Sequence, residues 1–433
     1  MRTLPFFLAA AVSAPALAAA QTAPTAPTAP TAPTAPGAPA APTEPTEPAG
    51  PTPETPVSTP TPAGSTTAPD AAGDTAPAGP AVTVGGYVEG YYQLSFQDPS
   101  NRITNLRGFD SRSRTFTLSN VALSVQGEKG PVTAHLVLQV GHTPSTYYLA
   151  ETASPGTGSV NSSSAELWKY LQAATLSAKL PGEWLLEAGL FPSPVGIEVI
   201  PVKDNWNWSR SNLFFGLPFY HTGVTLSRPI GGGWTGKLHV YNGWNTVVDN
   251  NDTPSVALSA AYTDDKTSAQ LLYFGGNERP TGAAEGKPWR NLFDALVQRS
   301  ITDDLAIAAQ ADAGFEKNDV GTSSWAAGAL YGKLALSSKL YAAVRGDYFY
   351  EKVAEDQGNR ASAIFWPTKW MASGTATLAY QPADGVSARL EYRHDQAKDD
   401  VFFGGDVSVD DTGAFVPNRK AQDTVTVGVT TWF

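Results

Sequence analysis

The sequence predicts an all-β protein: a transmembrane antiparallel β-barrel of about sixteen strands, preceded by a disordered Pro-rich segment. The first reason is that, beyond Pro80, apolar and polar side chains alternate in runs of about ten residues, as in strands with two different faces. The second reason is that the breaks between these runs are short and long in turn. The third reason is an export signal with no later apolar stretch long enough for a membrane-spanning helix.

Residues 1–20 have the pattern of a secretory signal peptide. A single positive residue, Arg2, precedes an apolar run, and the small residues up to Ala20 form a cleavage site just before Gln21. A membrane-anchoring helix is the alternative, but the run is shorter than the roughly 20 residues that a span needs and contains Pro15. We expect cleavage after Ala20.

Residues 21–80 are almost entirely Thr, Ala, Pro, Gly and Ser, so they cannot form a core. Proline at every third position in the first part favours polyproline II, and the extended segment would reach on the order of 180 Å. It therefore predicts either a disordered tail without a partner or a spacer that tethers the barrel. The domain boundaries are 1–20, 21–80 and 81–433.

The overall charge and the cysteine count narrow the classes of partner. The formal net charge is -11, which argues against nucleic acid as a partner. It also argues against a protein whose main task is to hold anions. The chain has no cysteine, which is compatible with export but also with a cytosolic protein.

The alternating runs define the expected strands. Their lengths match the ~9 to 11 residues with which a tilted strand crosses the hydrocarbon layer, with some excess at the rims. The expected strands are 81–97, 113–126, 132–144, 166–180, 184–192, 218–229, 234–244, 254–263, 267–276, 290–301, 305–316, 323–336, 339–352, 370–381, 386–398 and 421–433.

The connections between these strands also favour a membrane barrel over a soluble sandwich. Even-to-odd connections are tight turns such as 181–183, 264–266 and 302–304, whereas odd-to-even connections such as 193–217 and 399–420 are long. A barrel with an even number of strands and both ends in the periplasm has this asymmetry of short periplasmic turns and long outer loops.

Charged residues fall on one face of the late strands, opposite an apolar face that we expect to meet lipid. These charges are expected to point into the lumen, where they line a pore or pair with one another and stiffen the wall. The candidates on strands 339–352 and 386–398 are Arg345, Asp347, Arg389, Glu391, Arg393 and Asp395. The pattern is poorer in 113–126 and 290–301, where charged and apolar side chains share a face.

Aromatic residues gather where the strands are expected to meet the membrane interfaces. Those on the periplasmic side are Trp184, Trp234, Tyr262, Tyr380 and Phe433, and those toward the outer loops are Trp168, Tyr170, Tyr348, Tyr350 and Trp370. The last strand alternates up to Phe433, as in the C-terminal signal that the barrel-assembly machinery reads, although Thr431 stands where that signal usually has an aromatic residue.

Loop 193–217 is long and aromatic. Left in solvent it would expose large apolar side chains such as Trp206 and Phe214, so we expect it either to fold into the barrel as a constriction or to pack across the outer rim. Arg210 is its candidate for a pore-facing charge.

The segment from Asn205 to Ser211, followed by Leu213 to Val224, resembles the OmpL-like β-barrel porin family, and Gly189-Leu190-Phe191 with Gly196 fits the same pattern. The likeness is strongest between about 184 and 245. It implies an outer-membrane barrel with a pore function and carries over no catalytic residue.

We find no pattern that indicates an enzyme, a cofactor or a metal site. His394 and Asp395 are adjacent and therefore point to opposite faces of one strand. The histidines at 135, 221 and 239 are expected in the lumen without partner spacing, and the acidic loop 399–420 lacks the ligand spacing of a calcium site.

These features together predict a bacterial outer-membrane porin for passive diffusion of small hydrophilic solutes or ions. The alternative is a structural barrel that its own loops plug and that anchors the Pro-rich arm. The expected partners are outer-membrane lipid, lipopolysaccharide, the assembly machinery and small solutes. The outward alanines of 305–316 are compatible with a homo-oligomer contact.

Overall fold

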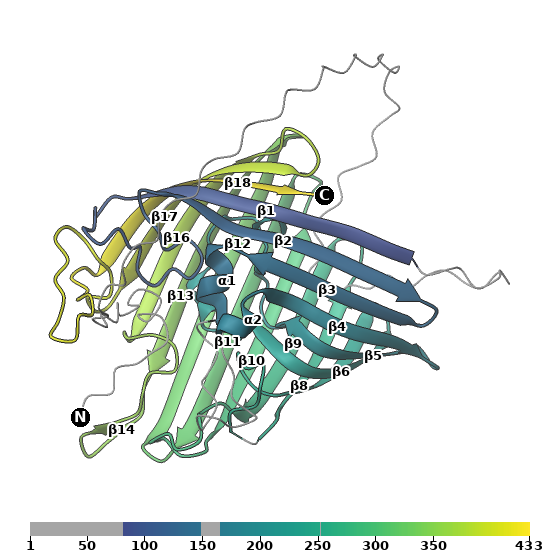
Figure 1. Ribbon diagram of the computed structural model, residues 1–433, viewed down its shortest axis with the longest axis horizontal. Coiled ribbons are helices and arrows are strands. Elements are labelled where there is room, and N and C mark those ends of the chain that lie inside the picture. Colours follow the sequence, from purple (N-terminus) through teal and green to yellow (C-terminus); the bar gives the residue numbers. More distant parts are fainter. Residues whose placement is uncertain (1–80, 149–164, 252) are drawn as a thin grey trace, which may run out of the picture. The chain divides into compact units, whose positions relative to one another are not determined.

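The computed structural model describes residues 81–148, 165–251 and 253–433, and these residues form a closed antiparallel barrel (Figure 1). The closed order is β1-β18-β17-β16-β13-β12-β11-β10-β9-β8-β7-β6-β5-β4-β3-β2. The predicted fold class is thus confirmed. The predicted signal peptide and Pro-rich segment lie outside the described residues.

The strands of the barrel are β1 (Ala81–Ser95), β2 (Phe116–Lys129), β3 (Val132–Val140), β4 (Leu171–Leu180), β5 (Trp184–Pro192), β6 (Tyr220–Gly231), β7 (Trp234–Tyr241), β8 (Ser255–Thr263), β9 (Thr267–Asn277), β10 (Trp289–Ser300), β11 (Leu305–Asn318), β12 (Gly321–Ser337), β13 (Leu340–Lys352), β16 (Trp370–Tyr380), β17 (Val386–Ala397) and β18 (Ala421–Trp432). The loops carry the short elements α1 (His142–Tyr147), α2 (Ala165–Trp168), η3 (Val202–Asp204), α3 (Asn212–Phe215), β14 (Glu355–Asp356) and β15 (Asn359–Arg360). Within the described ranges, no helix combines the length and apolar character that a membrane span requires.

Predicted strand 166–180 begins too early, because its first residues form α2 and β4 begins only at Leu171. Predicted strand 132–144 ends too late. β3 ends at Val140, and α1 begins two residues later. Gly141 has a φ of 139°, where only glycine is unstrained, and Pro144 has no N–H for a ladder bond but is tolerated in the first turn of a helix. The strand therefore stops where its backbone can no longer pair.

The irregular alternation in 113–126 has a structural cause. The register of β1 against β2 shifts between Glu89 and Gly90, which leaves Ser119 without an opposite residue. Phe116 lies before this bulge and faces outward, 88% exposed, while Ala122 lies after it and faces the lumen, 4% exposed. The bulge exchanges the two faces of β2, so one alternation could not fit the whole strand.

The irregular strand β10 shows that the lumen is not uniformly polar. Leu292 and Asp294 both point inward and are buried. Leu292 belongs to an apolar cluster with Phe274 on β9 and Trp325 on β12. Part of the interior is therefore packed like a protein core.

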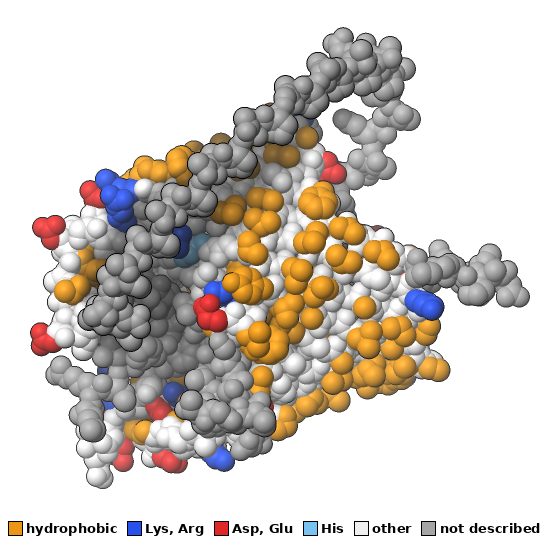
Figure 2. Space-filling model, viewed as in Figure 1, with side chains coloured by type: hydrophobic (Ala, Val, Ile, Leu, Met, Phe, Trp, Pro, Cys, Tyr) orange, Lys and Arg blue, Asp and Glu red, His pale blue; other side chains and the backbone are white. Residues whose placement is uncertain are grey.

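The outer wall carries the apolar band expected of a membrane barrel, seen as scattered hydrophobic side chains across the strands in Figure 2. Leu258, Leu271 and Val344 are more than half exposed on this wall. The charged side chains Arg345, next to Val344 on β13, and Asp294 on β10 point inward and are buried. The apolar face therefore meets lipid and the polar face meets the lumen.

The barrel closes between its first and last strands. Tyr87 of β1 pairs with Trp432 of β18. Gly86 and Phe433 exchange two backbone hydrogen bonds, of 3.2 and 3.1 Å. A Cβ at Gly86 would lie 2.5 Å from the carbonyl oxygen of Ala122, so only glycine fits at this end of the seam.

Candidate functional site: the loop inside the barrel

Loop 193–217, which connects β5 to β6, lies inside the barrel and touches opposite walls. The side-chain amide of Gln270 on β9 donates to the Pro194 carbonyl at 2.8 Å. The N–H of Val202 donates to the Glu89 carboxylate on β1 at 2.5 Å. Because β1 and β9 lie half-way around the ring from each other, the loop crosses the lumen.

Inward carboxylates hold the backbone of this loop. Glu391 on β17 accepts from the N–H groups of Trp208 and Ser209, at 2.5 and 3.0 Å. Asp347 on β13 accepts from the N–H of Asn212 at 3.1 Å. Hydrogen bonds to a charged acceptor are about twice as strong as neutral ones, so these contacts fix the loop against this wall.

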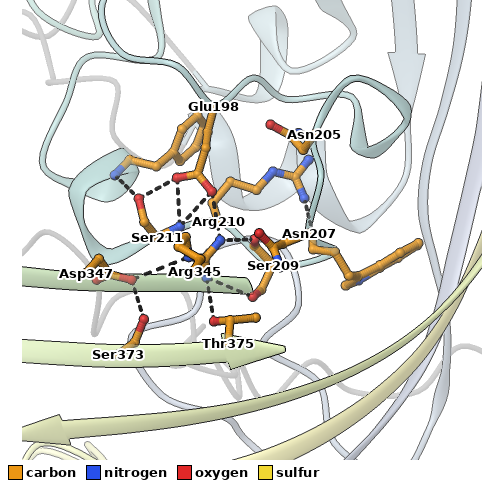
Figure 3. Close-up of polar contacts among 12 residues, drawn as sticks. Glu198, Asn205, Asn207, Ser209, Arg210, Ser211, Arg345, Asp347, Ser373 and Thr375 are labelled. Atoms are coloured by element: carbon orange, nitrogen blue, oxygen red, sulfur yellow. Dashed lines mark hydrogen bonds and ion pairs between the residues drawn. The ribbon is translucent and has the colours of Figure 1, made fainter. Parts of the chain in front are cut away.

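Arg345 on β13 is at the centre of the contact (Figure 3). Its guanidinium lies 2.8 Å from the Glu198 carboxylate of the loop and 3.4 Å from Asp347. It also donates to the Ser209 carbonyl at 2.5 Å and to the Thr375 hydroxyl at 3.0 Å. One cation therefore joins a strand, its neighbour and the loop.

A second set of ion pairs ties another outer loop to the same wall. Arg393 donates to Asp395 at 2.8 Å and to the Asn212 side chain at 3.0 Å. Arg107, in the loop between β1 and β2, lies 3.2 Å from Asp395 and also pairs with Asp110. Burial raises the pKa of the Asp110 carboxyl, but the Arg107 guanidinium outweighs it and holds that pKa below its usual range.

Arg210 organises the loop itself. Its guanidinium donates to the carbonyls of Val199 and Trp208, at 3.1 and 2.9 Å, and also to that of Ile200. The guanidinium carbon lies 5.2 Å from the centre of the Phe109 ring. These contacts close the loop into a compact turn.

All seven predicted pore-lining residues point to the interior and are buried. None is more than 6% exposed, because each contacts the loop or a neighbouring charge. Their part in lining an ion path remains a prediction. These residues are Arg210, Arg345, Asp347, Arg389, Glu391, Arg393 and Asp395.

Three further side chains at the site were not predicted: Glu89, Glu198 and Gln270. The alternation of side chains along a strand is enough to place Glu89 and Gln270 in the lumen, because the neighbours of each in its strand are outward apolar residues. No sequence signal links Glu198 to Arg345, which lies 147 positions away.

The periplasmic end of the lumen is accessible to water along β2 to β7. On β2 to β7, many inward polar side chains near the periplasmic turns are half-buried or exposed. They carry charges of both signs. These side chains are Gln126, Thr133, His135, Thr175, Ser177, Lys179, Glu187, Ser227 and Lys237.

The luminal histidines have neutral partners. His239 contacts the hydroxyls of Thr225, Tyr241 and Ser259, at 2.9, 2.8 and 3.2 Å. His221 contacts the Ser193 hydroxyl at 3.0 Å and the carbonyl that follows β7 at position 243, at 2.8 Å. Across the described residues, no three His, Cys, Asp or Glu side chains are grouped to hold a metal ion.

A model of the family described as "Putative beta-barrel porin-2, OmpL-like" matches residues 81–433. A search of curated proteins found no sequence match.

Solved structures are similar in fold. The outer membrane channel DcaP of Acinetobacter baumannii is 13% identical, with a TM-score of 0.54 and coverage of 84% of this chain and 100% of that one. The anion-selective porin from Comamonas acidovorans is 12% identical, with a TM-score of 0.52 and coverage of 82% and 100%. OmpT of Vibrio cholerae, an outer membrane protein in its trimer form, is 9% identical, with a TM-score of 0.51 and coverage of 82% and 99%.

Proposed function

Because the chain belongs to the OmpL-like β-barrel porin family, whose barrels are outer-membrane channels for passive diffusion, we propose that loop 193–217 is the constriction that limits which solutes pass. The observation that carries this proposal is the contact of the loop with opposite walls, at Gln270 and Glu89. A barrel of about sixteen strands is otherwise wide enough for an aqueous channel. Loop 193–217 would reduce the cross-section of such a channel and leave the path for solutes on one side of the loop.

The water-accessible side of the lumen is the periplasmic part of the wall formed by β2 to β7. Water-accessible side chains there include Lys179, Glu187 and Lys237, so both signs of charge face the path. Small hydrophilic solutes fit such a lining better than apolar ones, because its water-accessible polar side chains can hydrogen-bond to them. On the β13–β17 wall, the buried ion pairs have a different task, which is to hold the loop.

Conductance separates this function from the plugged structural barrel. Purified full-length protein is reconstituted in planar bilayers, and swelling of liposomes that contain it is followed with sugars of increasing size. We expect discrete conducting steps and a sharp size limit. A protein that inserts but gives no steps would instead be a plugged barrel.

Ion selectivity is read from the reversal potential in a salt gradient. The mixed charges on the water-accessible side of the lumen predict weak selectivity, and the net charge of -11 argues against a strong preference for anions. A strong anion preference would contradict this charge assignment.

Family and fold point to a channel rather than to an enzyme. We propose that His221 and His239 are structural, since their neutral partners lack the carboxylate that orients a catalytic histidine. Ester hydrolysis by the purified protein that is lost in His221→Gln would overturn this assignment.

We propose three further partners: membrane lipid, lipopolysaccharide and the barrel-assembly machinery. The exposed apolar band fits lipid, with lipopolysaccharide on the outer side, and the strand that ends at Phe433 fits recognition by the barrel-assembly machinery. Phe433→Ala is expected to lower the amount of folded protein in the outer membrane, as measured by heat-modifiable mobility.

A further inference from the structure

A groove of about 1220 Å³ runs across the outer, lipid-facing wall over β6 to β11. Its upper edge is a row of bulky outward side chains that are direct neighbours in the strand pairing. This row is Leu226, Leu238, Leu258, Tyr273 and Phe293.

The floor is the next cross-strand row toward the periplasm. Its members are Gly236, Ala260, Leu271, Ala295 and Ala311, which also pair in sequence around the wall. Four of the five are glycine or alanine, so the floor lies below the bulky row, and only Leu271 projects from it. Trp184, Pro229 and Ile230 line the low end of the groove. The paired outward residues Trp234 and Tyr262 lie one row closer to the periplasm.

The floor rises from the periplasmic rim into the membrane. Gly236 is the third residue of β7, next to a periplasmic turn, whereas Ala311 is the seventh residue of β11. Strands are spaced about 4.8 Å apart, so the floor is roughly 20 Å long. With strands tilted by about 40°, such a row is inclined to the membrane plane and approaches its middle.

Arg228 stands at the low end of this floor, paired directly with Gly236. It is exposed, and its guanidinium carbon lies 5.5 Å from the centre of the Trp184 ring. Among the described residues, no carboxylate forms an ion pair with it. Trp234 and Tyr262 lie close by with ring centres 5.2 Å apart, so aromatic rings mark the headgroup level here.

We propose that this groove binds one phospholipid of the periplasmic leaflet, with the phosphate on Arg228 and an acyl chain along the floor from Gly236 to Ala311. A guanidinium matches phosphate oxygens in a bidentate geometry, and the apolar floor matches a single chain. Lipopolysaccharide is the ligand of the other leaflet, on the far side from Arg228. A second copy of the chain would bury Arg228 against an apolar wall without a counter-charge, which is unfavourable.

Native mass spectrometry of the full-length protein in detergent tests this proposal. Delipidated protein is titrated with dipalmitoyl phosphatidylglycerol and, separately, with dipalmitoyl glycerol, which has the same chains but no phosphate. We expect one tightly retained phosphatidylglycerol per barrel and much weaker retention of the diacylglycerol.

Two variants locate the site, and a third is the control. Arg228→Gln should weaken phosphatidylglycerol retention at least ~10-fold, as expected for the loss of a charged hydrogen bond. Gly236→Leu should block the floor; a Cβ there meets only the Ile230 side chain at 3.6 Å, so the barrel should still fold. Gly346→Leu places the same side chain on the lipid-facing side of β13, where a Cβ meets nothing within 4 Å, and should leave retention unchanged.

Heat-modifiable mobility confirms that each variant is folded before it is titrated. Equal retention in all three variants would overturn the proposal and indicate unspecific annular lipid. Loss of an oligomer in Gly236→Leu, with lipid retention unchanged, would also overturn it and assign the groove to a second copy of the chain.

Discussion

Two walls of the barrel hold the same loop by different chemistry. On the β13–β17 wall, Arg345 and Glu391 bind loop 193–217 through buried charges. On the β9–β11 wall, Gln270 and Gln310 bind it through side-chain amides, the latter accepting from the N–H of Ile197 at 3.0 Å. Removing one partner of a buried ion pair leaves a desolvated charge, whereas water can replace a neutral amide at a half-buried position such as Gln270. The charged wall therefore fixes the loop, and the amide wall only aligns it.

The largest effect is expected for Arg345→Met. The change leaves Glu198 and Asp347 buried without their cation, which costs about 3–5 kcal/mol. The free energy of unfolding in urea should fall by this amount, and single-channel conductance should rise as the loop leaves the wall. Arg299→Met is the control, because Arg299 is exposed and binds only the Thr267 hydroxyl among the contacts described for it. An Arg345→Met protein with unchanged stability and conductance would remove the distinction between the walls.

Acid is expected to have an intermediate effect through Asp110. The pKa of this carboxyl is lowered below the ordinary 3.8, so its contribution is complete above the ordinary value and is lost as pH falls through the lowered one. Losing the charged bonds to Arg107 costs about 1.5–3 kcal/mol. The part of the conductance that depends on Asp110 should stay constant from neutral pH to about pH 4, given the ordinary carboxyl range, and change only below it.

Asp110→Asn sharpens the acid experiment. It should show at neutral pH the conductance that the parent shows in acid, while Asp410→Asn, in an exposed loop, should behave as the parent does. A conductance change centred above pH 5 in the parent would assign the effect to another group.

The smallest effect is expected for Gln270→Ala on the amide wall. It removes the hydrogen bond to Pro194 and the side-chain contact with Asp294, at a half-buried position where water can take the place of the amide, so about 1 kcal/mol is lost. Urea unfolding should barely shift, and the sugar size limit in liposome swelling should stay the same. A loss as large as that of Arg345→Met would mean that both walls fix the loop equally.

The sequence was sufficient for the barrel but not for the lumen. Alternation and turn length depend on neighbours along the chain, so strand number and the inward direction of Arg345 and Arg393 could be predicted. The bulge at Ser119 could not, because it depends on the pairing of β2 with β1. The apolar cluster in the lumen could not be predicted either. In the sequence an inward leucine such as Leu292 looks like an outward one, and only the structure places it beside Phe274 and Trp325.

The loop shows the same limit. Its apolar content left two positions open, inside the barrel or across the rim. The choice is made by contacts such as that of Trp208 with Glu391, which lie 183 positions apart. Contacts between residues so far apart leave no recognisable pattern in the local sequence.

The seam between β1 and β18 sets the order in which the barrel can be completed. Gln93 and Thr426, which bond across it at 3.2 Å, are 333 positions apart. All other neighbouring strands of the barrel are consecutive or nearly so along the chain, so this pairing is the one that must wait for β18. Before β1 and β18 pair, the open sheet has unpaired edges that can join other chains. The addition of β18 is thus the step at which an aggregation-prone sheet becomes a closed wall.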